Sequence, residues 1–285
     1  MTIAEALVLF LRANLVASVA IAVVLLLRKP VRRAFGAHIA YGLWPIALFA
    51  VAGALMPLLQ EPNYYETGLL AGLPQTRDTG PAVAWLQAQG RDRIVLAAWL
   101  IGVAVSGVWA AISLARFMRA ERAGRAGPAV VGVVVPRLVA PADAAERFTP
   151  EEWRLVRAHE RAHMDRQDAR GAAVAVLAQW LCWFNPLVHM ALLAVRLDQE
   201  LACDATVLER LPVQRRRYAE TLLRTQLDHG PTYGIAWRGC GALETRLAML
   251  ATRQPPLDRL DLGEIAVNGL WIAAFVGGIA AQALV

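Results

Sequence analysis

Charged residues are scarce in this 285-residue chain. They make up only 18% of it, whereas 57% of the residues are hydrophobic and the mean hydropathy is +0.42. An average soluble domain has a much more polar composition. The composition therefore favours a membrane protein with a few spans and one modest water-facing domain over two small soluble domains.

Cysteine and lysine are also rare. The three cysteines, Cys182, Cys203 and Cys240, form no CxxC pair and no even-numbered set, which excludes a small extracellular fold built on disulfides. A reducing compartment suits them. Lys29 is the single lysine among 29 basic residues. The net charge of +6 is typical of a membrane protein whose cytoplasmic loops carry an excess of basic residues, and we attribute it to such loops. We expect a lipid bilayer as partner and no direct contact with nucleic acid.

Four long apolar runs are each long enough to cross about 30 Å of hydrocarbon as a helix. They divide the chain into three spans within 1–116 (about 6–27, 39–59 and 94–114, with an outer loop at 60–92), a water-facing domain at 117–262 and a fourth span at 263–285. Basic residues follow the first and third runs: Arg28, Lys29, Arg32 and Arg33, then Arg116, Arg119, Arg122 and Arg125. Because cytoplasmic loops carry the excess of Lys and Arg, we expect both termini outside and 117–262 in the cytoplasm.

The water-facing domain contains an HExxH pattern. A helix is expected to start at Thr149 and Pro150, and it carries His159-Glu160-Arg161-Ala162-His163. The two imidazoles lie one turn apart on one face, where zinc bonds of about 2 Å are available to both. Glu160 lies beside them, suited to take a proton from a zinc-activated water, whose pKa the metal can lower to about 7. Chance gives HExxH in roughly one such sequence in two hundred, and a core or pH-sensing histidine pair is the other alternative.

A catalytic zinc needs a third protein ligand downstream. Position 169, at the metzincin spacing, is Ala, and Asp165 and Asp168 are expected about 200° and 140° around the helix from His163. The next carboxylates are Asp198, Glu200 and Asp204.

Glu200 and Asp204 lie at i and i+4 on one helix face, whereas Asp198 points the other way. We predict Glu200 as the third ligand. Asp204 is then expected to accept a hydrogen bond that fixes the tautomer of a ligand imidazole.

An apolar segment, residues 172–195, separates the two halves of this predicted site. If it crossed the bilayer, His163 and Glu200 would lie on opposite sides, so we expect it to double back at Asn185–Pro186 as two helices. The sequence leaves open whether this hairpin packs inside the zinc domain or dips into the membrane interface.

The motifs HERAHMDRQD and WFNPLVHMALLAVRLDQELACDATVL resemble the zinc domain of the BlaR/MecR-type antirepressor metallopeptidases, membrane gluzincins of beta-lactam signalling. The segments WLIG, PAVVGVVVPRLVAP, YAETLL and LETRLAML are also similar to that family. The resemblance implies a mainly α membrane protein of the bacterial inner membrane, with four transmembrane helices and a cytoplasmic α+β gluzincin domain between helices three and four. It implies cleavage of a small winged-helix DNA-binding repressor. Glu200 and Asp204 match the family's ExxxD positions, and Asp168 matches its acidic position after the second histidine, where we expect a supporting role.

One departure from that family concerns its penicillin-binding sensor, which follows the last span and is acylated at a Ser-x-x-Lys serine. This sequence ends at Val285, and no serine stands three residues before Lys29. We therefore expect any signal to arrive through the outer loop, the membrane or a separate sensor protein.

The expected reaction is zinc-dependent peptide hydrolysis with Glu160 as base. The strand predicted at 129–135 is suited to pair with the substrate backbone, and Arg246, Tyr218 and His229 are candidate oxyanion donors. Two alternatives stay open: a quality-control or processing protease of the HtpX or CaaX type, and a non-catalytic signalling module with a structural zinc.

Overall fold

The computed structural model describes residues 1–56, 81–227, 240–252 and 255–282. It is mainly α-helical, in agreement with the predicted class. Within these described ranges, four helical stretches are long and apolar enough to cross a membrane: Ile3–Phe35, Ala37–Leu55, Pro81–Arg122 and Leu257–Ala281.

One bundle of helices packs around the first span. It consists of α1 (Ile3–Phe35), α2 (Ala37–Tyr41), α3 (Pro45–Leu55) and α12 (Leu257–Ala281). Glycines allow α3 and α12 to touch: a Cβ on Gly53 would lie 2.0 Å from the carbonyl oxygen of Phe275, and one on Gly278 would lie 2.1 Å from that of Ala50. Small residues of this kind let membrane helices approach closely.

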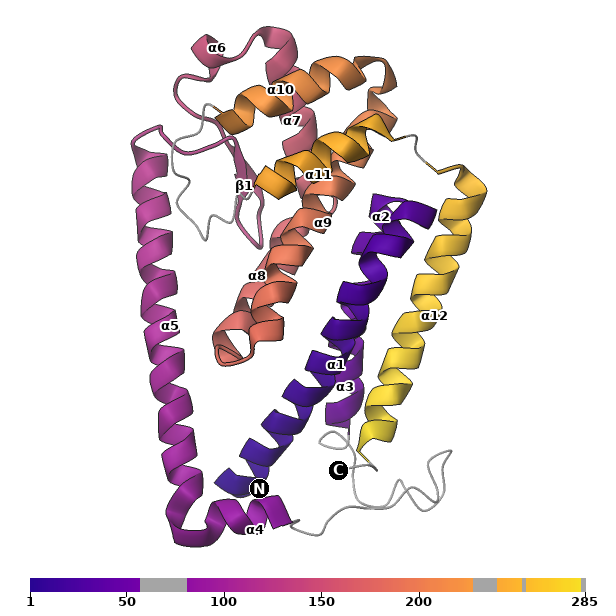
Figure 1. The fold of residues 1–285 in the computed structure, drawn as a ribbon. Helices are drawn as coiled ribbons and strands as arrows, with labels where there is room; N and C mark the ends of the chain where they lie inside the picture. The colour runs from indigo at the N-terminus through magenta and orange to yellow at the C-terminus, as the bar shows by residue number, and fades with distance from the viewer. Residues whose placement is uncertain (57–80, 228–239, 253–254, 283–285) are drawn as a thin grey trace.

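The third span packs on the start of α1, and most of its length then runs away from that bundle (Figure 1). Its elements are α4 (Pro81–Gln87), the 3₁₀ turn η3 (Ala88–Gly90) and α5 (Arg91–Arg122). An outer loop was expected at 60–92. Residues 57–80 lie outside the described part, but residues 81–92 are helical, because Val83 and Leu86 bury an apolar face against Ala4 and Leu7.

The bounds of the other spans also differ from the prediction. Helix α1 continues beyond residue 27 through its basic cluster to Phe35, and α12 begins at Leu257 rather than at residue 263. The cluster stays helical because Arg28 and Arg32 pair with Asp198 of α9 (Pro186–Arg210). Among the described residues α3 ends at Leu55, short of the predicted 59.

A short β-hairpin follows α5. Strands β1 (Ala129–Val131) and β2 (Arg137–Val139) pair antiparallel, with Val130 opposite Leu138. One strand was predicted over 129–135, and this was wrong. Gly132 has φ +100° and turns the chain, so residues 133–135 form the tip of the hairpin.

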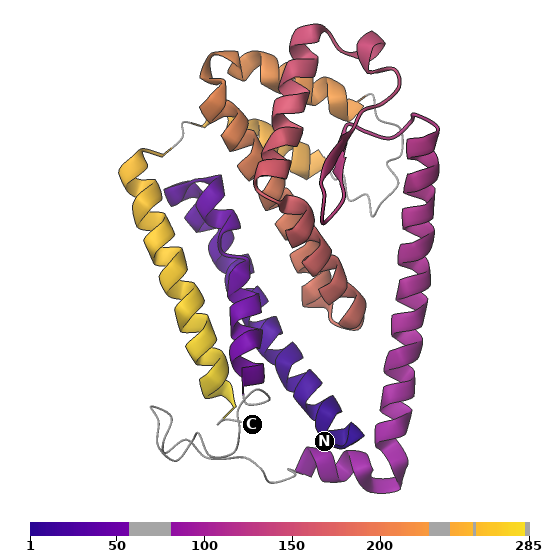
Figure 2. The same cartoon turned by 180° about the vertical axis from the view of Figure 1, so that it is seen from behind.

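The remaining helices lie at one end of the molecule or extend from that end toward its middle (Figures 1 and 2). They are α6 (Ala144–Arg147), α7 (Pro150–Asp165), α8 (Asp168–Leu181), α9 (Pro186–Arg210), the 3₁₀ turn η4 (Pro212–Gln214), α10 (Arg215–Leu227) and α11 (Cys240–Ala251). Leu155 of α7, Val207 of α9 and Leu222 of α10 meet in their core. Helices α8 and α9 form a hairpin, and Asn185 caps α9 at the predicted turn.

Candidate metal centre

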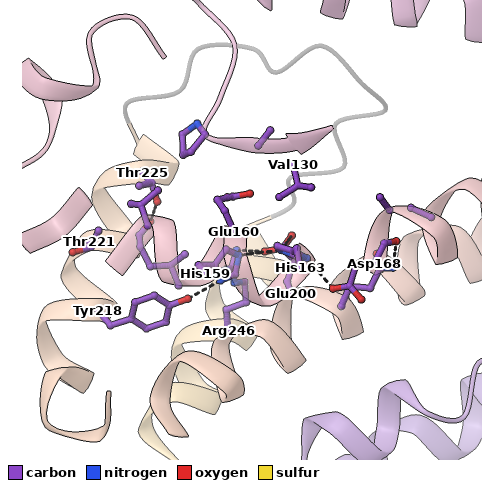
Figure 3. A pocket seen from close by; sticks show the side chains of 17 residues that line it. Val130, His159, Glu160, His163, Asp168, Glu200, Tyr218, Thr221, Thr225 and Arg246 are labelled. Atoms are coloured by element: carbon purple, nitrogen blue, oxygen red, sulfur yellow. Dashed lines mark hydrogen bonds and ion pairs between the residues drawn. The ribbon is translucent and has the colours of Figure 1, made fainter. Parts of the chain in front are cut away.

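Five helices contribute to one cavity of about 330 Å³. The histidines come from α7, which starts at Thr149 as predicted: Thr149 and Glu152 form a reciprocal capping box. The other polar lining residues come from α8 to α11: Asp168, Gln199, Glu200, Tyr218, Thr221, Thr225 and Arg246. Segments far apart in the sequence therefore converge on the HExxH turn (Figure 3).

The three predicted ligands lie next to one another. The Nε2 atoms of His159 and His163 are 3.2 Å apart. Glu200 Oε2 lies 3.3 Å from His159 Nε2, and Glu200 Oε1 lies 3.7 Å from His163 Nε2. Zinc–nitrogen bonds of about 2.0–2.1 Å in a tetrahedral site put two ligand nitrogens roughly 3.3 Å apart, so the spacing of the histidines fits a zinc ion.

Each imidazole has an acidic or phenolic partner at its other nitrogen. His163 Nδ1 lies 2.9 Å from Asp168 Oδ2. His159 Nδ1 lies 2.9 Å from the hydroxyl of Tyr218, which donates to Asp204 Oδ1 at 2.5 Å, and Asp204 Oδ1 itself is 3.3 Å from His159 Nδ1. When each ring carries its proton on Nδ1, the lone pairs of the two Nε2 atoms point toward each other. A cation between the two rings stabilises this arrangement.

The electrostatics of the cluster also favour a cation. Burial lowers the pKa of His159, but hydrogen bonds to Asp204 and Glu200 outweigh it and raise this pKa to about 10. Burial would raise the pKa of Glu200, yet Arg246 and His159 hold it well below its usual range. The carboxylates thus stay ionised and stabilise positive charge at the imidazoles.

Asp168 contacts His163, although the sequence predicted that it would lie on a different side of the same helix. That prediction assumed that one helix continues past His163. Instead α7 ends at Asp165, Gln167 takes a left-handed conformation with φ +57°, and Asp168 starts α8. The turn brings the Asp168 carboxylate back to His163, which identifies the contact partner that the sequence left unknown.

Arg246 holds two carboxylates at once. Its Nε and Nη2 donate to Asp204 at 2.8 and 2.7 Å, and its Nη1 lies 2.8 Å from Glu200 Oε2. Burial would raise the pKa of Asp204, but Arg246 lowers it to about 2. This bidentate pairing was not anticipated, because the sequence suggested only oxyanion stabilisation for Arg246.

Glu160 points into the cavity on the same side as the imidazoles (Figure 3). Its side chain is buried, and burial raises its pKa, against the opposing effect of His159 and His163. A carboxylate with a raised pKa beside a metal-binding cluster can accept and return a proton.

Two other polar residues around the centre were not singled out from the sequence for their contacts. The thiol of the fully buried Cys203 lies 3.2 Å from His163 Nδ1 and 3.3 Å from Asp168 Oδ2. Gln199 donates to the carbonyl oxygen of Asp168 at 3.2 Å. The only available signal was their position in the sequence: Cys203 lies within the ExxxD segment, and Gln199 directly precedes it. His229 lies outside the described residues.

One family model and several known proteins match this sequence. The family model described as BlaR1 peptidase M56 matches residues 8–250. The chain is 31% identical over 98 residues to Regulatory protein BlaR1 of Bacillus licheniformis. This alignment covers 34% of this chain and 16% of that protein. It is 28% identical over 101 residues to Methicillin resistance mecR1 protein of Staphylococcus aureus, covering 35% and 17%, respectively.

The matched segments therefore span less than a fifth of the length of these relatives. No solved structure is significantly similar to the chain. The family match, in contrast, extends over most of the sequence and includes the HExxH helix, Glu200 and Arg246. The chain thus belongs to the BlaR1 peptidase M56 family.

Proposed function

We propose that this membrane protein is a zinc-dependent endopeptidase with His159, His163 and Glu200 as metal ligands and Glu160 as catalytic base. The observation that carries the proposal is the distance of 3.2 Å between the two Nε2 atoms, with the Glu200 carboxylate facing both. Glu160 distinguishes this proposal from a structural zinc site, which has no use for a buried base in an open cavity.

Zinc, when bound, polarises a peptide carbonyl and lowers the pKa of a water molecule. Glu160 takes the proton of the attacking water and returns it to the leaving amine. Asp168 and the Tyr218–Asp204 pair keep the Nδ1 protons on the two ligand histidines. Arg246, whose terminal nitrogens each have one further N–H, stays the proposed oxyanion donor, and it holds Glu200 in its charged form.

The cavity is suited to an extended peptide. Pro128, Ala129 and Val130 line it, and β1 pairs only with β2 among the described residues. The other edge of β1 is therefore proposed to pair with the substrate backbone beside the histidines.

The charge distribution supports a cytoplasmic metal centre in the bacterial inner membrane. The basic ends of α1 and α5 lie at the same end of the molecule as the cavity, whereas the N-terminus and the end of α12 lie at the opposite end (Figure 1). Under the positive-inside rule this distribution supports the proposal that both termini lie outside. The family match supports a protein substrate, which we propose to be a winged-helix repressor as the family resemblance implies. A separate sensor protein is proposed as the source of the signal.

The test compares the wild-type chain with Glu160→Gln in vesicles. Mass spectrometry of the metal should find one zinc per chain in both proteins. Only the wild type should cleave a co-expressed winged-helix repressor. Undiminished cleavage by Glu160→Gln would sink the proposed mechanism. Unchanged signalling by Glu160→Gln, with its zinc retained, would favour a non-catalytic module with a structural zinc.

A further inference from the structure

The hairpin formed by α8 and the first part of α9 contains no charged residue between Gly171 and Val195. Its polar side chains find partners within the protein. Gln179 Nε2 lies 2.8 Å from His189 Nδ1, and His189 Nε2 lies 2.8 Å from the carbonyl oxygen of Trp183. Internal pairing of this kind is what a hydrocarbon environment demands, because lipid tails offer no hydrogen bonds.

The tip of the hairpin is hydrogen-bonded to the interior of the first span. Asn185 Nδ2 donates to Asn14 Oδ1 at 2.6 Å and lies 2.8 Å from Ser18 Oγ. Both partners lie well inside α1, away from its ends. The turn of the hairpin therefore lies at the depth of a membrane-spanning helix.

The opposite side of the tip is bonded to α5. Trp180 Nε1 donates to the carbonyl oxygen of Val103 at 2.7 Å, and Trp99 Nε1 donates to that of Leu181 at 2.9 Å. A Cβ on Gly102 would lie 2.0 Å from the ring of Trp183, so the hairpin packs directly on the backbone of α5. In both views the hairpin lies between α1 and α5 (Figures 1 and 2).

The rise per residue of a helix gives the depth of the tip, measured from the side of the metal centre along α8 and from the opposite side along α1 and α5. Residues 171–181 of α8 rise about 15 Å, whereas Asn14 lies about 16 Å along α1 from Ile3, and Trp99 about 12 Å along α5 from Arg91. The hydrocarbon core is about 30 Å thick. The tip thus lies near the middle of the spans and the hairpin turns back without crossing.

Large apolar side chains are exposed on both helices of the hairpin. The exposed fractions are 49% for Leu177, 40% for Trp180 and 52% for Met190. The neighbouring helix α5 exposes a similar surface, with Ile101 at 64%, and none of its most apolar stretch is buried. The apolar surface of the hairpin is therefore continuous with that of a span, which identifies lipid as the occupant.

We propose that α8 and the start of α9 form a re-entrant hairpin that enters the bilayer from the side of the metal centre and presents its exposed apolar side chains to lipid hydrocarbon. Asp168 begins α8, and Ala169 and Ala172 line the cavity of the metal centre. The centre consequently lies at the boundary between water and lipid, within reach of peptide segments near the membrane surface.

Spin labels on the full chain in phospholipid vesicles test this hairpin. The background is the chain with Cys182, Cys203 and Cys240 replaced by alanine, checked by thermal unfolding against the wild type. Leu177→Cys and Met190→Cys carry the label on α8 and α9. Ile101→Cys serves as the lipid-facing control, and Arg216→Cys, whose side chain is 93% exposed on α10, serves as the water-facing control.

Accessibility of each label to oxygen and to a water-soluble nickel chelate is then measured. We expect the labels at Leu177→Cys and Met190→Cys to match that at Ile101→Cys, with high oxygen and low nickel accessibility. The ratio of oxygen to nickel accessibility should be lower at Val174→Cys, which lies nearer the membrane surface. Nickel accessibility equal to that of Arg216→Cys would place the hairpin in water and overturn the proposal. Low accessibility to both reagents would mean that protein, such as a second copy of the chain, covers the surface, and would also overturn it.

Should the labelled α8 variant not fold, Met190→Cys on α9 gives the same three outcomes by itself. The measurement needs neither zinc nor peptidase activity. A failure here therefore leaves the proposed function untouched, and a failure of the proposed function leaves the hairpin untouched.

Discussion

Asp198 and Glu200 lie two residues apart on α9 and bind opposite parts of the protein. Glu200 faces the two histidines of the metal centre, whereas Asp198 accepts hydrogen bonds from Arg28 at 3.0 Å, Arg32 at 3.2 Å and Trp44 at 2.9 Å. About 200° of helix rotation separates neighbours at i and i+2. One helix therefore connects the metal centre to the first two spans through a buried ion pair.

We expect Asp198→Asn to destabilise the protein without removing its zinc. Asp198 and Arg28 are 1% and 9% exposed, and breaking a buried ion pair by removing one charge costs about 3–5 kcal/mol. Thermal unfolding in detergent should show a clear fall in Tm. The folded variant, measured below its Tm, should contain as much zinc as the wild type. The exposed Asp258→Asn is the matched control, and an equal Tm for the two variants would refute this role of Asp198.

Asp168→Ala should weaken zinc binding. The carboxylate contacts His163 Nδ1 at 2.9 Å, and loss of such a partner of a ligand histidine typically lowers metal affinity about 10–100-fold. Competition with a chelator measures the affinity. Asp165→Ala removes an exposed carboxylate three residues away, paired with Arg210, and should have no effect. Equal affinities in the two variants would contradict the contact.

Tyr218→Phe removes one hydroxyl and keeps the aromatic ring in the core. That hydroxyl contacts both His159 Nδ1 and Asp204, so we expect zinc affinity to fall, by up to about 10-fold, with little change in Tm. Chelator competition and peptidase kinetics are measured on the same samples. A lower kcat at unchanged zinc affinity would instead assign the hydroxyl to the oxyanion, as the sequence also allowed.

Arg246→Met should destabilise the zinc-free protein strongly. Removing the guanidinium leaves the carboxylates of Asp204 and Glu200 side by side in a largely buried site, at a cost of about 3–5 kcal/mol. Zinc should restore part of the lost Tm, because it neutralises the same charges. Arg246→Lys should be intermediate, since an ammonium lacks the bidentate geometry. A loss of kcat with unchanged Tm in both variants would mean that Arg246 acts on the substrate alone.

The sequence alone predicted the features that depend on residues close together in the chain. The apolar runs identified four spans because hydropathy over about 20 residues decides whether a helix can cross a bilayer. The spacing of His159 and His163 put both rings on one face because helical periodicity is local. The position of the turn at Asn185–Pro186 followed from proline, which disfavours helix at its preceding residue, although the need to double back came from the shared metal site.

Features that depend on where a helix ends were less predictable. The strand at 129–135 was misjudged because a single glycine turn ends it at residue 131, and residues 81–92 of the predicted outer loop were misjudged because a small buried face makes them helical. Asp168 was placed on the wrong side of its helix because the end of α7 two residues after His163 carries no strong sequence signal.

The sequence by itself determined that this is a mainly helical membrane protein with an HExxH helix, and that Glu200 and Asp204 share a face. Only the tertiary structure decided which side chains complete the centre: Asp168, Tyr218 and Arg246 reach the histidines and carboxylates from three other helices. The reason is physical. Helix faces follow from the spacing of neighbours, whereas hydrogen bonds between separate helices depend on how their apolar faces pack together.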